Sequence, residues 1–363
     1  MLQNVLYSVA TLCLLGGALA GALLVADRLL LNYGPCAVDV NEEETLMVEG
    51  GCSLMDALYE HEIFIPSGCG GQGTCGHCKV TVLSGGGPVP PTELPLLSRQ
   101  EVAGGVRLAC QVKVKEDLRL RVPEEYFDIR RFEAEVESAS MVAPEVREIR
   151  LRLLEPERIE FSPGQYVQVE VPTREGTVHR AYSIASSPDR AERIDLVVRR
   201  VPGGTGSTYL HEVRGGDRIA FTGPYGEFEL SPDPQTEIVC VAGGCGIAPI
   251  KSIVQYVCAR WPERPCRLFF GVRTRADVFY REWLDRLRAK HPNFEVHLSL
   301  SEPGEHAGWE GETGFIHRSV ERHLGAARPR QAFLCGPEPM IEAAEEVLKQ
   351  KGVPDDAIYY DSW

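Results

Sequence analysis

The chain begins with a long apolar run. Residues 1–26 contain no charged side chain and are rich in Leu, Ala, Gly and Val, which is long enough to cross a bilayer as a helix. A cleaved signal peptide would begin with a positive region and keep its apolar stretch to about 7 to 15 residues, and this segment has neither property. Residues 1–33 are therefore predicted to be a retained N-terminal transmembrane helix. Arg28 follows the run and favours a single-pass topology with a cytoplasmic C-terminal body.

Residues 34–125 mix strand-like alternation with one short helix. Ser53 is a typical N-cap for a helix over residues 53–61, and the small residues 67–74 interrupt any regular element. The predicted strands cover residues 37–48, with an acidic turn inside, and residues 79–83, 107–114 and 118–122. This pattern predicts an α+β domain that ends at the acidic linker 123–125.

Residues 126–233 show a different pattern, in which short apolar runs recur between Pro, Gly and Asp without helical periodicity. The clearest runs are residues 167–171, 194–201 and 218–222. Such spacing is typical of a small antiparallel β-barrel.

Residues 234–363 alternate strands with amphipathic helices. The predicted strands are 237–242, 267–271 and 294–300, and the predicted helices are 250–260 and 279–290. This alternation predicts an α/β doubly wound domain with a parallel sheet.

Composition agrees with a folded, multidomain protein. With 363 residues, 44% hydrophobic and 25% charged, the chain can form two or three domains, each with its own core. The net charge of −14 argues against nucleic acid as a partner, because phosphate binding needs clustered Lys and Arg. Acidic residues outnumber basic ones in residues 34–125, which suits either a basic docking partner or a solvated surface. The twelve cysteines are not spaced like a secreted disulfide framework, so reducing surroundings are expected.

Four cysteines carry the strongest chemical signal. Cys69, Cys75 and Cys78 share one glycine-rich loop, and Cys110 follows at a distance. A [2Fe–2S] cluster needs four thiolates, and three from one loop plus one distant cysteine is the plant-type arrangement. The alternative, a zinc ribbon, uses two paired C-x-x-C knuckles, and only one is present here. His77 lies between two of these cysteines, but a Rieske centre would need two histidines, so His77 is expected to be a bystander.

The cysteine loop and two nearby motifs resemble a known family. Five residues separate Cys69 from Cys75, and the chain also contains Pro91-Thr-Glu-Leu94 and Arg107-Leu-Ala-Cys110-Gln111. These features resemble the ferredoxin domain of the F subunits of Na⁺-translocating NADH:quinone reductases, and the resemblance extends over nearly the whole chain. It implies a membrane-anchored NADH dehydrogenase that works with the membrane redox subunits of a multi-subunit complex in the inner membrane. The familiar F subunits carry a long insertion before Arg180, whereas this chain has only the short connection 173–179.

The segment Arg180-Ala-Tyr182-Ser183 resembles the flavin motif of the ferredoxin reductase superfamily. A guanidinium there can clamp the FAD pyrophosphate, an aromatic ring can pack on the isoalloxazine, and a hydroxyl can hydrogen-bond the N5 atom that accepts hydride. The resemblance therefore implies FAD as a cofactor and a catalytic role for Ser183. The residues that it assigns to FAD are Arg180, Tyr182, Ser183, Val198, Arg199, Gly206, Ser207 and Thr208.

Two further segments point to a pyridine nucleotide. Gly243-Gly-Cys-Gly-Ile-Ala-Pro249 follows an apolar strand and opens a helix, where glycines allow phosphates to approach the helix N-terminus, although the spacing is not the G-x-G-x-x-G fingerprint. This segment and Cys335-Gly-Pro337 resemble the two nucleotide motifs of the same superfamily. The resemblance assigns NADH to Gly243, Gly244, Gly246, Pro249, Arg273, Gly336 and Pro337.

Two residues complete the expected reaction site. The resemblance places Cys335 beside the nicotinamide, and because no base accompanies this cysteine, it is expected to shape the site rather than to act as a nucleophile. Arg273 could pair with the 2′-phosphate of NADPH, but the resemblance is to users of NADH. The C-terminal residue Trp363 resembles a terminal aromatic that stacks on the flavin and moves aside for nicotinamide, and the alternative is a frayed terminus.

The three regions together predict an ordered electron path. NADH gives up two electrons as a hydride, which a flavin can accept and a one-electron cluster cannot. The expected path therefore runs from NADH to FAD, to the [2Fe–2S] cluster and then to an acceptor in the membrane. A reductase component that serves an oxygenase or another soluble acceptor is the alternative, and a non-enzymatic ferredoxin carrier is disfavoured by the two nucleotide-type regions. With one helix and no intramembrane ionisable path, any ion translocation is expected to occur in partner subunits.

Overall fold

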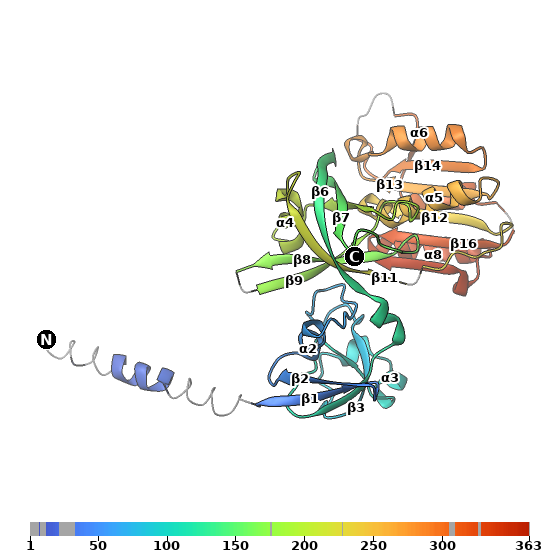
Figure 1. The fold of residues 1–363 in the computed structure, drawn as a ribbon. Helices are drawn as coiled ribbons and strands as arrows, with labels where there is room; N and C mark the ends of the chain where they lie inside the picture. Colours follow the sequence, from blue (N-terminus) through green and yellow to red (C-terminus); the bar gives the residue numbers. More distant parts are fainter. Residues whose placement is uncertain are drawn as a thin grey trace. The chain divides into compact units, whose positions relative to one another are not determined.

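The computed structural model describes residues 7, 12–21, 33–174, 176–226, 228–304, 309–325 and 328–362 (Figure 1). Its contacts divide the chain into two compact units, Met1–Asp128 and Ile129–Trp363. Residues 12–21 are helical, and the leucines at positions 12, 14, 15 and 19 are exposed. Within the described residues, no helix is both long enough and apolar enough to cross a membrane. Most of the predicted anchor, residues 1–33, lies outside the described part of the chain.

The first unit contains a five-stranded mixed sheet in the order β2-β1-β5-β3-β4. The strands are β1 (Pro35–Val40), β2 (Glu44–Glu49), β3 (Lys79–Ser84), β4 (Val106–Leu108) and β5 (Leu118–Arg121). The helices are α2 (Leu54–Glu60) and α3 (Arg99–Ala103). Ser53 caps α2 as predicted, because its Oγ accepts a hydrogen bond of 3.1 Å from the backbone N–H of Asp56. Leu54 and Leu58 of α2 are buried against this sheet in one core.

The predicted strand over residues 107–114 is wrong beyond Leu108. The backbone turns there, with the N–H groups of Gln111 and Val112 donating to the Leu108 carbonyl at 2.8 and 3.1 Å. The turn carries Cys110 to the glycine-rich loop, where its Sγ lies 3.3 Å from that of Cys78. A straight strand would hold Cys110 in the sheet instead, so the cysteine cluster determines where β4 ends.

The second unit begins with a six-stranded antiparallel sheet in the order β10-β7-β6-β11-β8-β9. The strands are β6 (Arg130–Ala143), β7 (Val146–Glu155), β8 (Tyr166–Thr173), β9 (Gly176–Ser183), β10 (Arg193–Arg199) and β11 (Arg218–Tyr225), with one helix, α4 (Thr205–Glu212). An isolated bridge between Ile184 and Leu196 joins the two edges of this sheet. The result is the antiparallel barrel that the apolar runs predicted, with Phe132, Val169 and Phe221 in its core.

A parallel six-stranded sheet follows, in the order β15-β14-β13-β12-β16-β17. The strands are β12 (Glu237–Gly243), β13 (Cys266–Val272), β14 (Phe294–Leu300), β15 (Glu312–Thr313), β16 (Arg330–Gly336) and β17 (Ile358–Ser362). The helices are α5 (Ile247–Arg260), α6 (Arg281–Lys290), α7 (Ile316–His323) and α8 (Glu338–Gln350). Ile238 and Cys240 of β12 pack in one core with α5 and α6, whereas Val239 and Val241 pack in another with α7 and α8. The sheet is therefore covered on both faces, as expected for a doubly wound domain.

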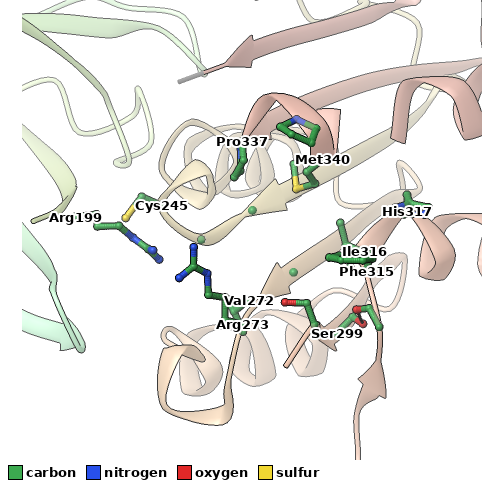
Figure 2. Close-up of a pocket in the computed structure, with 16 residues that line it drawn as sticks. Arg199, Cys245, Val272, Arg273, Ser299, Phe315, Ile316, His317, Pro337 and Met340 are labelled. Carbon is green, nitrogen blue, oxygen red and sulfur yellow. Dashed lines mark hydrogen bonds between the residues drawn. The ribbon is translucent and has the colours of Figure 1, made fainter. Parts of the chain in front are cut away.

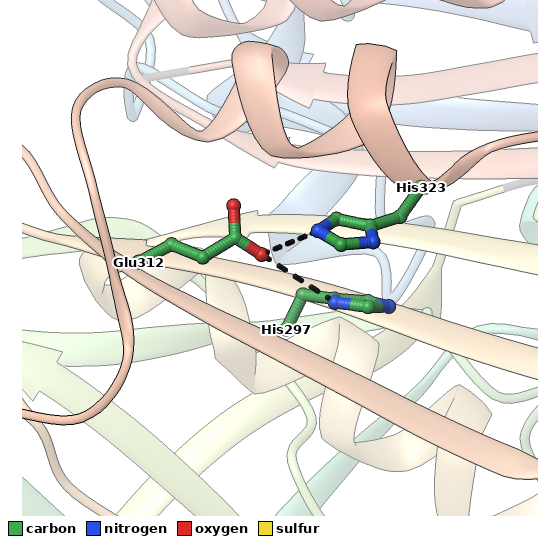
Figure 3. Close-up of side chains that lie close together, drawn as sticks. All are labelled: His297, Glu312 and His323. Atoms are coloured by element: carbon green, nitrogen blue, oxygen red, sulfur yellow. Dashed lines mark ion pairs between the residues drawn. The ribbon is translucent and has the colours of Figure 1, made fainter.

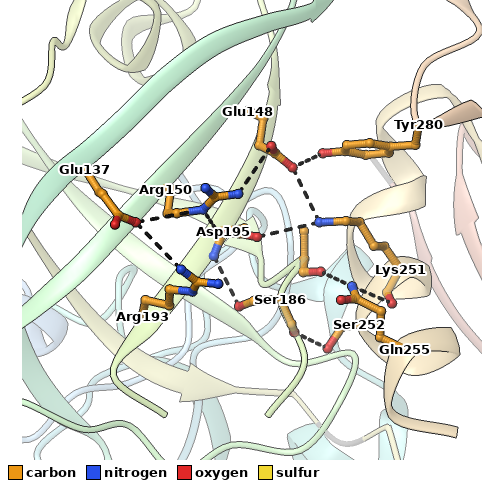
Figure 4. A network of polar contacts seen from close by, with 11 residues as sticks. Glu137, Glu148, Arg150, Ser186, Arg193, Asp195, Lys251, Ser252, Gln255 and Tyr280 are labelled. Carbon is orange, nitrogen blue, oxygen red and sulfur yellow. Dashed lines mark hydrogen bonds and ion pairs between the residues drawn. The ribbon is translucent and has the colours of Figure 1, made fainter. Parts of the chain in front are cut away.

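Polar contacts join the barrel to the parallel sheet (Figure 4). Lys251 of α5 places its Nζ 3.4 Å from Glu148 Oε1 of β7 and 3.6 Å from Asp195 Oδ2 of β10. The hydroxyl of Tyr280 also donates to Glu148, and the ammonium of Lys251 lies 4.9 Å from the centre of the Tyr280 ring. Because the Lys251 side chain is only 8% exposed, these contacts form a buried ionic connection between the two domains.

Candidate cofactor sites

The four predicted cluster cysteines converge in two close pairs. Cys75 Sγ lies 3.4 Å from Cys69 Sγ, and Cys78 Sγ lies 3.3 Å from Cys110 Sγ. Both separations exceed the roughly 2.05 Å of a disulfide bond. Four glycines of the loop have positive φ angles, which allow it to wrap around the sulfur atoms: Gly70, Gly71, Gly73 and Gly76.

Within each sulfur pair one thiol donates to the other, which raises the pKa of the donor, Cys75 or Cys78, and lowers the pKa of the acceptor. A bond from the Cys75 thiol lowers the pKa of Cys69 to about 3, with help from the backbone N–H groups of Thr74 and Cys75. The Cys78 thiol is the main cause that lowers the pKa of Cys110, and the Gln111 side chain and the Gly73 backbone add to it. Four convergent sulfurs with N–H groups directed at them suit the thiolate ligands of an iron–sulfur cluster. The residues present therefore fit a [2Fe–2S] cluster.

The two motifs of the first unit that carry the family resemblance are in contact. The Arg107 guanidinium donates two hydrogen bonds to the Glu93 carboxylate, at 2.9 and 2.8 Å, and both side chains are almost fully buried. Glu93 also accepts the backbone N–H of Leu108 at 3.0 Å, and Thr92 Oγ1 donates to Gln111 Oε1 at 3.2 Å. These bonds hold the turn that presents the fourth cysteine.

The flavin motif lies on β9, beside the first turn of α4. Arg180, Tyr182 and Ser183 are partly exposed along this strand. A Cβ added to Gly206 would lie 2.7 Å from Tyr182 Oη and 2.8 Å from Arg180 Cγ. Only glycine at this position therefore allows α4 to pack this closely against β9. A helix N-terminus beside a guanidinium can bind a pyrophosphate, so these residues fit the predicted FAD site.

The other four residues assigned to FAD lie on β10 and α4. Ser207 accepts the N–H of Val201 at 3.1 Å, so its hydroxyl fixes the turn before α4, and Thr208 follows in the same helix. Val198 is buried in the barrel core, with its carbonyl 3.0 Å from His211 Nε2. Arg199 instead reaches the parallel sheet, where it lies beside Cys245 (Figure 2).

A cavity of about 490 Å³ lies at the carboxyl ends of the parallel strands (Figure 2). Strand order reverses at β12, between β13 and β16, and open sheets of this class bind ligands at such a point. The cavity brings together these predicted residues: Arg199, Gly243, Gly244, Arg273 and Pro337. Four other predicted residues are buried next to it and do not line it: Gly246, Pro249, Cys335 and Gly336.

Close packing at the cavity floor explains the glycines. A Cβ on Gly243 would lie 2.6 Å from Met340 Sδ, and a Cβ on Gly271 would lie 2.9 Å from Ile316 Cβ. Cys335 is only 1% exposed, and burial raises its pKa well above the ordinary thiol value. A neutral, buried thiol suits a shaping role better than a nucleophilic one.

Sequence motifs did not reveal several residues that line the cavity. Phe315, Ile316 and His317 come from the start of α7, and Met340 comes from the start of α8. Phe315 is 68% exposed although it is large and apolar, and this feature of the folded chain is not visible in the sequence. Trp363 lies outside the described residues, so its predicted position on the flavin stays a prediction.

Family models match the chain in three successive segments. The 2Fe-2S iron-sulfur cluster binding domain matches residues 37–115, the oxidoreductase FAD-binding domain residues 133–230, and the oxidoreductase NAD-binding domain residues 240–346. These matches confirm the [2Fe–2S], FAD and NADH cofactors predicted from the sequence.

Solved structures with the same architecture include two reductases. The Amycolatopsis cytochrome P450 reductase GcoB has a TM-score of 0.72 and 32% identity, and the match covers 90% of this chain and 98% of that one. The ferredoxin reductase in carbazole 1,9a-dioxygenase has a TM-score of 0.69 and 29% identity, with the same coverage.

Curated relatives match over nearly their whole length. The Na(+)-translocating NADH-quinone reductase F subunit of Neisseria gonorrhoeae is 36% identical over 389 residues, covering 95% of this chain and 96% of the relative. The F subunit of the same enzyme from Yersinia enterocolitica is 34% identical over 407 residues, covering 99% of this chain and all of the relative. With all three domain types matched in order as well, this chain belongs to the family of the F subunits of Na(+)-translocating NADH-quinone reductases.

Proposed function

We propose that the chain is the electron-input subunit of a Na⁺-translocating NADH:quinone reductase. It oxidises NADH and delivers electrons to the membrane redox subunits of that complex. The observation that carries this proposal is the match to the F subunits over nearly the full length of both chains, together with three cofactor-type sites in one chain. We assign the cluster domain to residues 34–125, the flavin barrel to 126–233 and the NADH domain to 234–363.

The residues of the second unit bind and orient the two nucleotides. Gly243 and Gly244 line the cavity at the carboxyl end of β12, where we place the NADH phosphates near the start of α5, and Arg273 adds positive charge at the same cavity. Arg180 holds the FAD pyrophosphate, and Ser183 offers its hydroxyl to the flavin ring. Flavin, when bound, accepts the hydride and passes on single electrons, which a [2Fe–2S] cluster can carry. Positioning by these residues is sufficient, since hydride transfer needs no general base.

Residues 1–33 anchor this subunit in the inner membrane as a single helix, with the body in the cytoplasm. The support for this proposal is the uncharged run over residues 1–26, which is long enough to cross a bilayer. Trp363, in the same proposal, covers the flavin until nicotinamide displaces it.

A second candidate function is that of a reductase for an oxygenase. It is supported by the likeness to the P450 reductase and the dioxygenase ferredoxin reductase, each matched over 98% of its length. The short hairpin between β8 and β9, where the familiar F subunits have an insertion, also supports this second function.

Purification from native membranes distinguishes the two functions. We expect a tagged chain to bring down membrane redox subunits in fixed stoichiometry, with NADH:quinone activity that increases with Na⁺. Detergent-solubilised chain that elutes alone, and that supports turnover of an oxygenase but not of quinone, would contradict the first function and support the second.

A further inference from the structure

Two histidines and one glutamate converge outside the cofactor sites. His297 lies on β14, Glu312 on β15 and His323 at the end of α7 (Figure 3). Each residue offers one ligand atom, and these atoms all lie within 4.8 Å of one another. We propose that His297, Glu312 and His323 form a binding site for a divalent transition-metal ion of the zinc class.

Distances in the cluster are close to those that zinc requires. Glu312 Oε1 lies 2.8 Å from His323 Nε2 and 3.6 Å from His297 Nδ1. Two ligands of a tetrahedral zinc ion, each bonded at about 2.0–2.1 Å, lie about 3.3 Å apart. These two distances fall on either side of this value, so each glutamate–histidine distance needs to change by only about half an ångström or less. Three protein ligands leave the fourth position to water.

One side chain must turn for the metal to bind. The imidazole rings of His297 and His323 are stacked, with centroids 4.2 Å apart and 21° between their planes, so their lone pairs do not yet meet at one point. His323 is free to adjust, because its side chain is 40% exposed and the outer torsion of histidine is broad. His297 is the fixed ligand, held on its other face by the ring of Phe269 at 5.0 Å.

Neighbouring groups orient the ligands. A metal on His297 Nδ1 places the ring proton on Nε2, which is buried without a hydrogen-bond partner among the described residues. Glu295 Oε2 lies 3.8 Å from this nitrogen, where a carboxylate stabilises a metal-bound histidine. Ser319 Oγ donates to Glu312 Oε1 at 3.0 Å, and Arg322 pairs with Oε2, so the glutamate is held with Oε1 toward the histidines.

The location gives this site a connection to the nucleotide cavity. Residues Gly314 to His317, which line that cavity, lie in the chain between the ligands Glu312 and His323. A bound metal would therefore tie both ends of the cavity rim to β14, which also lines the cavity through Ser299.

Metal counting on the full chain, with its flavin and iron–sulfur cluster assembled, tests the site. We expect equilibrium dialysis against Zn²⁺ to add one ion per chain to the wild type and to raise its melting temperature by a few degrees. His297→Ala and Glu312→Gln should weaken this binding at least tenfold and abolish the shift. The control His61→Ala removes an exposed histidine of the first unit and should bind Zn²⁺ like the wild type.

A ligand replacement separates metal binding from folding. His323→Cys supplies another zinc ligand and should retain the ion, whereas His323→Asn should lose it, with the flavin content checked in both. Equal Zn²⁺ uptake by wild type, His297→Ala and Glu312→Gln, or no uptake by wild type, would overturn the proposal and leave the cluster as a network of ion pairs.

Discussion

Glu93 and Arg107 carry charges that water does not reach. Their side chains are 0% and 6% exposed, and the guanidinium also donates to the carbonyls of Gly86 and Gly87. A buried ion pair of this kind adds little stability relative to an apolar pair, but removing either partner leaves the other as an unpaired buried charge. The pair also fixes the turn before Cys110, so a substitution that breaks the pair is expected to displace this cysteine.

We therefore expect Glu93→Ala to destabilise the first unit by about 3–5 kcal/mol, because Arg107 is left buried without its counter-charge. Urea unfolding, monitored by the loss of the cluster absorbance, measures this change in unfolding free energy. Arg119→Gln, which removes two ion pairs of an arginine that is 54% exposed, is the matched control and should cost less than about 1 kcal/mol. Equal midpoints for the two variants would show that the buried pair is not needed.

Gly206→Ala tests the contact between α4 and the flavin motif. The new methyl group would lie 2.7 Å from Tyr182 Oη and 2.8 Å from Arg180 Cγ, so both side chains must move from the proposed FAD site. We expect FAD affinity to fall at least tenfold, as measured by flavin release on dilution. Gly215→Ala, whose Cβ would have no neighbour closer than 3.8 Å, should keep its flavin.

The sequence indicates the roles of some residues but not the contacts that others make in the folded chain. The sequence predicts the four cysteines as cluster ligands because metal chemistry restricts both residue type and spacing, and the structure places their sulfur atoms in two close pairs. The need for glycine at position 206 could not, because it depends on side chains of another element that come within contact distance only in the folded chain. The family resemblance assigned Ser207 to FAD, but in the structure its hydroxyl accepts a hydrogen bond from the backbone N–H of Val201. The sequence alone does not reveal this contact.

At the scale of elements, three strands of the parallel sheet were predicted with nearly correct bounds. The expected strand 294–300 agrees with β14, where apolar and polar residues alternate, and residues 237–242 agree to within one residue with β12, which is a nearly continuous apolar run. The elements β16, α8 and β17 were not predicted, and neither were the two-residue strand β15 and the helix α7, which is rich in Arg and His and buries only one narrow stripe. The short polar elements β15 and α7 form the rim of the cavity and hold two of the proposed zinc ligands.

Lys251 joins α5 to β7 and β10 and is expected to set the position of the NADH domain on the barrel. Lys251→Met removes one of the two cations that Glu148 and Asp195 share, and Arg150 still pairs with both, so we expect a loss of about 1–3 kcal/mol in unfolding free energy. Flavin reduction by NADH should also slow in stopped-flow experiments, because hydride transfer depends on orientation. Arg158→Gln, in a pair whose side chains are 66% and 75% exposed, should change neither quantity.

At the scale of the molecule, the cluster and the nucleotide sites belong to units with separate hydrophobic cores. Cys75→Ala should consequently abolish the EPR signal of the reduced cluster while flavin reduction by NADH stays within about twofold of wild type, because hydride transfer precedes the cluster. Loss of flavin reduction in this variant would mean that the units do not fold independently. Cys52→Ala, at a partly buried cysteine outside the four ligands, is the control and should keep both signals.

The division of the chain after Asp128 also has an evolutionary consequence. A unit that carries the one-electron centre can diverge, or be exchanged by recombination, without any change to the core that handles hydride. The choice of electron acceptor can then evolve separately from the choice of electron donor. One architecture can thereby serve both respiratory complexes and oxygenase systems.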